Sequence, residues 1–177
     1  GPNNGGKSIA LKSLGLAYLM AQSGYPVACQ SSNIHCIDGL YAHFPSKDDI
    51  ESGHGSFLAE MVHDGKIMNQ ITGDSFGILD EPCIGTEPAF AATQTGRYLE
   101  VMRSRGTPHI VATHMHALAD DVEKGEYPGV ENYQAEVSFK GSIPNLSYKI
   151  VPGKAGSSYG EAVAHQAGVD RASLGLP

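Results

Sequence analysis

The 177-residue sequence lacks several features that would each indicate a particular class of protein. Its three cysteines, Cys29, Cys36 and Cys83, form no C-x-x-C pair, which argues against a disulfide framework or a zinc knuckle and favours reduced thiols. No apolar run approaches the roughly 18 residues that a membrane span requires. No signal-peptide pattern is found either. We therefore expect a cytoplasmic protein that has no membrane partner.

An excess of positive charge is also missing. The chain carries 19 acidic and 12 basic side chains, a net charge of −7, which argues against this chain gripping a nucleic-acid backbone by itself. Any contact with DNA would then be made elsewhere. The hydrophobic content of 41% is ordinary for a soluble globular protein. The length fits one domain, residues 1–177, that can bury a sizeable core.

The most informative stretch is the first eight residues, which match G-x-x-x-x-G-K-[ST], the phosphate-binding P-loop. Its glycines allow the positive φ values that turn several N–H groups onto one phosphate. Lys7 is expected to reach the β- and γ-phosphates of ATP, and the Ser8 hydroxyl to ligate Mg²⁺. A glycine-rich turn that caps a helix is the alternative for this stretch taken alone. The candidate nucleotide-binding residues are Gly1, Pro2, Asn3, Asn4, Gly5, Gly6, Lys7 and Ser8.

A P-loop connects a strand to a helix, and no residues precede this one to form the strand. We expect the chain to be a fragment of a larger protein, or its first strand to be supplied by sequence outside it. Because that strand is central in such sheets, the chain by itself should be poorly stable.

Short apolar runs alternate with segments of helical periodicity along the chain. We expect the polar, glycine-rich residues 46–56 and the acidic residues 120–129 to form loops. The alternation predicts an α/β fold with a mainly parallel sheet, followed by a hairpin. Strands are expected at 26–29, 34–37, 76–79, 109–113, 131–137 and 146–151, with a further apolar run at 40–44, and helices at 9–23, 57–70, 89–104 and 161–167.

Two adjacent carboxylates, Asp80 and Glu81, follow the apolar strand at 76–79. The carboxyl ends of strands form the edge at which α/β sheets bind ligands. Asp80 is expected to hold the Mg²⁺ shell. Glu81 is expected to accept a proton from the attacking water, a role worth about 10²–10⁴ in rate. Without the P-loop, the same pair would indicate a solvated turn.

The strand at 109–113 ends in His114, which can place an imidazole near the γ-phosphate. We therefore predict His114 as a catalytic residue beside Glu81 and Lys7. A core or surface role is the alternative for a single histidine. His114 and His116 also form an H-x-H pair, but no third ligand is spaced to complete a metal site.

Taken together, these motifs resemble the ATPase domain of the MutS DNA mismatch-repair family, which is part of the ABC-type P-loop ATPases. The first eight residues are similar to the family's Walker A loop, whose Pro-Asn pair is family-specific. The stretch 85–88 resembles the D-loop in the G-T-[DE]-P form of the recombination-suppressing branch. The other similar segments are Walker B at 79–81, the switch histidine at 112–114, and the closing strand and helix at 148–153 and 158–164.

Residues 46–61 resemble the segment that carries the family's signature loop, which reaches across a dimer to the partner's γ-phosphate. The family often has Ser-Thr-Phe where this chain has Gly55-Ser56-Phe57, so the resemblance implies that Ser56 supplies the hydroxyl in trans. It also implies an ATPase that uses ATP and Mg²⁺ and acts as a homodimer or MutS-like heterodimer. DNA would be engaged by domains that this chain does not contain.

Two alternatives remain at this point. The first is an ABC transporter ATPase. Pro82, directly after the glutamate, favours this alternative, whereas the lack of an L-S-G-G-Q motif argues against it. The second is a nucleotide-gated switch with negligible hydrolysis, against which Glu81 argues.

Overall fold

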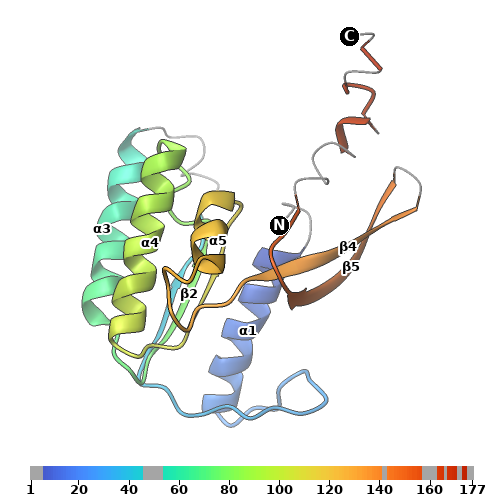
Figure 1. Ribbon diagram of the computed structural model, residues 1–177. Coiled ribbons are helices and arrows are strands. Elements are labelled where there is room, and N and C mark those ends of the chain that lie inside the picture. The colour runs from blue at the N-terminus through green and yellow to red at the C-terminus, as the bar shows by residue number, and fades with distance from the viewer. Residues whose placement is uncertain are drawn as a thin grey trace. The chain divides into compact units, whose positions relative to one another are not determined.

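The computed structural model describes residues 6–45, 54–140, 143–156, 163–165, 167–170 and 173–174. The chain divides into two compact units, one formed by Ser8–Gly129 and the other by Gly1–Lys7 together with Val130–Pro177. Figure 1 shows both units and labels most of their helices and strands.

The unit Ser8–Gly129 contains a parallel sheet of three strands. The middle strand, β2 (Phe76–Asp80), pairs with β1 (Leu40–His43) on one side and β3 (His109–Ala112) on the other. The predicted parallel sheet is therefore confirmed. Because all three strands run in one direction, their carboxyl ends lie at the same edge.

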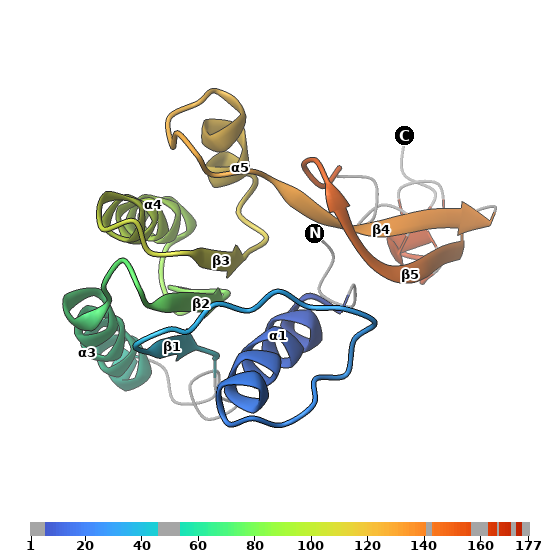
Figure 2. The same cartoon turned by 90° about the horizontal axis from the view of Figure 1, so that it is seen from below.

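Helices cover both faces of this sheet (Figure 2). Helix α1 (Lys7–Gln22) lies on one face, and α3 (His54–Gln70) and α4 (Pro88–Ser104) lie on the other. A short helix, α5 (His116–Glu123), follows β3 and packs against α4 through Leu118. None of the helices in the described ranges is long and apolar enough to cross a membrane.

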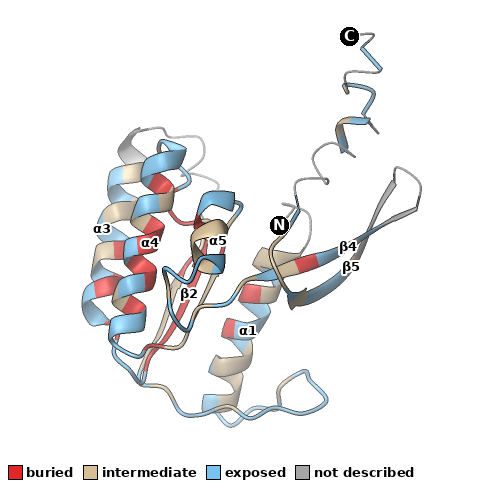
Figure 3. Ribbon diagram, in the orientation of Figure 1, coloured by how far each residue is buried: buried red, intermediate tan, exposed pale blue. Residues whose placement is uncertain are grey.

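Strand β2 is the core of the unit, and every one of its residues is buried (Figure 3). Its side chains alternate between the two faces, as the pleat of a strand requires. Ile78 packs with Leu11 of α1, whereas Leu79 packs with Met102 of α4. Helix α1 comes close at Gly15, where a Cβ atom would lie 3.2 Å from Cδ1 of Ile78. Because β2 is packed on both faces, the position of Asp80 at its carboxyl end is fixed.

The second unit contains an antiparallel hairpin of β4 (Tyr133–Lys140) and β5 (Ile143–Pro152). This confirms the predicted late strands and the hairpin between them. The register shifts between Ala135 and Val137, which marks an irregularity in β4. Residues 163–165 are helical within the predicted helix 161–167, of which residues 161, 162 and 166 lie outside the described part.

Three local predictions are wrong. Residues 26–29 and 34–37 form no strands. Most of them are exposed, and the Ile37 N–H donates to the side chain of Gln22 at 2.7 Å instead of to a neighbouring strand. The predicted loop at 120–129 begins inside α5, because the acidic residues that suggested a loop lie on a helix whose Leu118 is buried. Acidic character alone does not exclude a helix with one buried side.

Candidate active site

Asp80 is the last residue of β2 and lies at the carboxyl edge of the sheet, opposite Ala112 of β3. Only 2% of the residue is exposed, and its Oδ1 atom is buried without a hydrogen-bond partner. A buried carboxylate oxygen that lacks a partner is costly unless a cation or water completes it. Oxygen is also the donor that Mg²⁺ prefers, so Asp80 fits the predicted metal role.

Glu81 begins the turn after β2 and adopts a φ of +48°, which is unusual for a residue with a β-carbon. Its N–H donates to the carbonyl of Ala112 at 2.8 Å, so it is still tied to β3. Its side chain is 13% exposed. On a regular strand, the side chains of Asp80 and Glu81 would point to opposite faces of the sheet. The left-handed backbone at Glu81 breaks this alternation.

His114 contacts Glu81 directly. Its Nδ1 lies 2.7 Å from Oε2 of Glu81, and its backbone N–H donates to the same oxygen at 3.2 Å. The His114 side chain is 54% exposed, so the pair sits where a ligand at the sheet edge could reach it. The sequence predicted both residues separately, and the structure brings them together.

The P-loop prediction falls partly outside the described residues, which exclude Gly1, Pro2, Asn3, Asn4 and Gly5. The described end of the loop has the expected geometry. Gly6 adopts a φ of +79°, and α1 begins immediately after it at Lys7, followed by Ser8. The first turn of a helix presents free N–H groups and positive dipole to an anion.

Tyr148 is a candidate that the sequence motifs did not identify as a site residue. It lies on β5 with a φ of +58° and is 69% exposed. A Cβ atom added to Gly6 would lie 3.1 Å from Cδ1 of Tyr148, so the ring lies against the end of the P-loop. An exposed aromatic ring beside such a loop can stack on a nucleotide base.

Ser56 lies in the first turn of α3, and its side chain is outside the described residues. The start of this helix contacts the segment that follows Glu81. The rings of Phe57 and Phe90 meet edge to face at 6.2 Å, and Gly85 lies against Phe57. The end of the segment predicted to carry the signature loop and the predicted D-loop are therefore neighbours.

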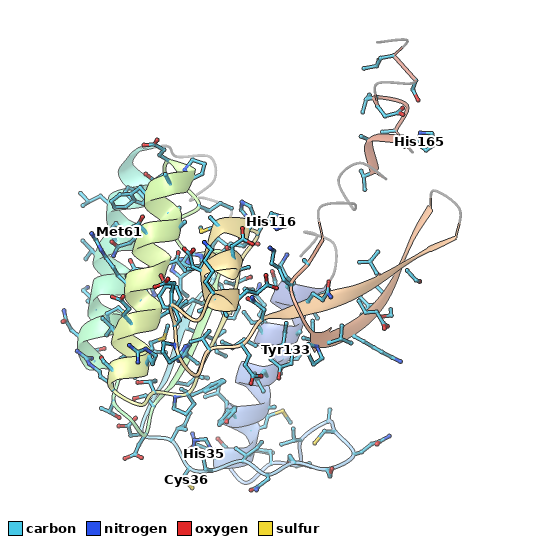
Figure 4. The ribbon with its side chains drawn as sticks, viewed as in Figure 1. His35, Cys36, Met61, His116, Tyr133 and His165 are labelled. Carbon is cyan, nitrogen blue, oxygen red and sulfur yellow. The ribbon has the colours of Figure 1, made fainter. Side chains whose placement is uncertain are left out.

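The H-x-H pair is not part of a metal cluster among the described residues. His116 is exposed at the start of α5 (Figure 4). Donor atoms close enough for a metal ion occur in two other sets, which share Asp64 of α3. The first contains His43, His63 and Asp64, and the second contains Glu60, Asp64 and Cys83.

Comparisons with known proteins identify the family. The family model described as MutS domain V matches residues 1–174. An endonuclease MutS2 from Gemmatimonas aurantiaca is 35% identical over 98% of this chain and 21% of its own length. DNA mismatch repair proteins MutS from Syntrophomonas wolfei and Prochlorococcus marinus are 34% and 36% identical over 96% of this chain and 20% and 18% of theirs. The chain thus spans about a fifth of the curated relatives it matches, and it belongs to the MutS domain V family.

Proposed function

We propose that this chain is the ATP-binding and hydrolysing domain of a MutS-like DNA mismatch-repair or recombination protein, with an ABC-type P-loop fold. The observation that carries the proposal is the 2.7 Å contact between His114 and Glu81, directly after Asp80 at the sheet edge. A carboxylate oriented by an imidazole is the arrangement expected of a general base. The relatives named as DNA mismatch repair proteins support a role in DNA repair. DNA would be bound by other parts of the protein.

Each site residue has a distinct task in this proposal. Lys7 meets the β- and γ-phosphates, and the N–H groups at the start of α1 bind the same anion. Ser8 and Asp80 would hold Mg²⁺, which supplies positive charge that offsets the charge developing on the phosphoryl group. Glu81 takes the proton of the attacking water. His114 orients Glu81 and, being half exposed, can respond to the γ-phosphate.

The proposed active form is a homodimer or a MutS-like heterodimer. The family membership supports a composite site in which Ser56 from one subunit contacts the nucleotide of the other. Its place in the first turn of α3 suits this role, because N–H groups there bind anions. In this arrangement the nucleotide state would be coupled to DNA through domains outside the chain.

The first test concerns Lys7. Replacing Lys7 with alanine should abolish tight ATP binding while the fold survives, because no other ammonium group follows the P-loop glycines directly. ATP at about 100-fold over its dissociation constant should stabilise the wild-type protein by about 2.7 kcal/mol. A thermal-shift measurement should show this gain in wild type and in Lys66→Ala, a control at an exposed lysine on α3. A Lys7→Ala variant that keeps the whole gain would refute the role of Lys7.

The second test concerns Tyr148. Replacing it with alanine should weaken ATP binding by roughly 5- to 150-fold, the equivalent of the 1–3 kcal/mol typical for stacking on one base. Tyr148→Phe should bind like wild type, because the ring is retained. Tyr133→Ala serves as a control, since Tyr133 is an exposed ring on the neighbouring strand (Figure 4).

Inorganic tripolyphosphate separates stacking from a general defect of the loop. It has no base, so calorimetry should give the same affinity for Tyr148→Ala and for wild type. Equal losses for ATP and tripolyphosphate would mean that Tyr148 only shapes the P-loop.

A further inference from the structure

The turn that carries Glu81 is strained at two positions. Glu81 has a φ of +48° and Cys83 a φ of +62°, and both bear a β-carbon that disfavours this region. Such backbone conformations persist only where surrounding contacts hold them. The bond from the Glu81 N–H to Ala112 holds the first position. The second position must be held from elsewhere.

The contact at the second position comes from helix α3. The Cys83 N–H donates to Oε1 of Glu60 at 2.5 Å, across 23 residues of sequence. Pro82 has no N–H, so this amide is the first after Glu81 that can anchor the turn. A hydrogen bond to an ionised carboxylate is shorter and stronger than one to a neutral acceptor. Glu60 is therefore the group that fixes the far end of the turn.

Glu60 lies beside a buried pair formed by His43 and Asp64. His43, at the end of β1, places its Nε2 3.5 Å from Oε1 of Glu60 and its Nδ1 2.8 Å from Oδ1 of Asp64. Asp64 lies one helical turn beyond Glu60 on α3 and is fully buried. A carboxylate only accepts, so the Nδ1–H of His43 donates to Asp64. His43 thus bonds β1 to Asp64 of α3, and its ring lies beside Glu60.

A metal ion is the competing explanation for these side chains, since donor atoms of Glu60, Asp64 and Cys83 lie within 4.8 Å of one another. Binding would require the Cys83 thiolate. Burial, with the nearby charges of Glu60 and Asp64, raises the pKa of the Cys83 thiol to about 12, so without a metal ion the sulfur is a neutral thiol. Glu60 and Asp64 also already accept bonds from protein donors. Because Oδ2 of Asp64 is buried without a partner, the metal content of the protein has to be measured to separate the two explanations.

We propose that Glu60 is a positioning residue for Glu81. It would couple α3, which begins in the segment predicted to carry the signature loop, to the hydrolysis site. The inference rests on the ATPase function proposed above. Glu60 lies four residues after Ser56, about 6 Å along the helix. A displacement of α3 when Ser56 meets the partner's nucleotide would therefore pass through Glu60 to the turn. Hydrolysis would then be fastest only when α3 is correctly placed.

The contact can be tested without turnover, by amide hydrogen exchange in the complete protein. In Glu60→Ala the Cys83 amide should exchange at least about 10-fold faster, because its acceptor is gone. Glu60→Gln keeps a carbonyl acceptor and should stay near wild type. Glu100→Gln, at an exposed position on α4, is the control. Unchanged exchange in Glu60→Ala would overturn the proposal.

Turnover provides a second measurement, because a residue with only a structural role would not change kcat selectively. Misplacing the base should lower kcat of Glu60→Ala by about 10²-fold while the dissociation constant for ATP stays within about threefold. Placed on a Glu81→Gln background, Glu60→Ala should cost less than about twofold more, because the group it positions is already disabled. An equal loss on both backgrounds would show that Glu60 acts independently of Glu81 and would refute the proposal.

Four further outcomes are distinguishable. Stoichiometric zinc that is lost in Cys83→Ser, but not in the exposed-cysteine control Cys29→Ser, would assign Glu60 to a metal and overturn the proposal. A wild-type protein that releases no phosphate from ATP would refute the proposed function, whereas Glu81→Gln turning over ATP like wild type would refute only the role of Glu81 as the base. Slow turnover in Glu81→Gln with normal turnover in Glu60→Ala would refute only the positioning role.

Discussion

Replacing Glu81 with glutamine is expected to lower ATP turnover by about 10²–10⁴, roughly 3–5 kcal/mol of barrier, with little loss of nucleotide affinity. A glutamine cannot take the proton of the attacking water. Its amide oxygen can still accept from both N–H groups of His114, so the geometry of the pair should survive. Phosphate release and equilibrium ATP binding, measured on the complete dimer, separate the two quantities.

Asp80→Asn is the informative companion variant. It should slow hydrolysis and also lower the affinity for Mg²⁺, because the buried Oδ1 of Asp80 is the oxygen that has no hydrogen-bond partner in the protein. A magnesium titration of nucleotide binding should therefore shift in Asp80→Asn and not in Glu81→Gln. If Glu81→Gln hydrolyses ATP near the wild-type rate, Glu81 is not the base, and His114 becomes the better candidate. A wild-type protein that binds ATP without releasing phosphate would favour a nucleotide-gated switch.

The sequence predicted the elements that carry the site because those elements have strong local signals. Strand β2 is an apolar run that ends in two carboxylates, and β3 is another that ends just before a histidine. Parallel strands bring their carboxyl ends to one edge, so the sequence placed both groups there. It did not predict the bond between Glu81 and His114. That bond depends on the register of Asp80 opposite Ala112 and on a positive φ, neither of which a motif specifies.

Contacts between distant parts of the chain were not predictable in the same way. Glu60 is an ordinary helix residue in the sequence, and its bond to Cys83 exists only because α3 packs beside the turn. Tyr148 lies against Gly6 although the two residues are 142 positions apart in the sequence, and no local pattern predicts this contact. The strands expected at 26–29 and 34–37 failed for the related reason that a strand needs a pairing partner as well as apolar residues.

Mixing two inactive variants should restore hydrolysis if the site is shared between subunits. A Lys7→Ala homodimer has the lysine missing from both sites, and a Ser56→Ala homodimer lacks the hydroxyl from both. In a mixed dimer, both changes fall on one composite site, and the other pairs an intact Lys7 with an intact Ser56.

Random exchange makes half of the dimers mixed, each with one working site, so about a quarter of wild-type activity should return. Phosphate release would be followed after subunit exchange, with the unmixed variants as controls. No recovery, in a mixture shown by mass to contain heterodimer, would place Lys7 and Ser56 in the same subunit's site. Activity that stays linear in protein concentration down to dilutions where only monomer remains would likewise rule out a shared site.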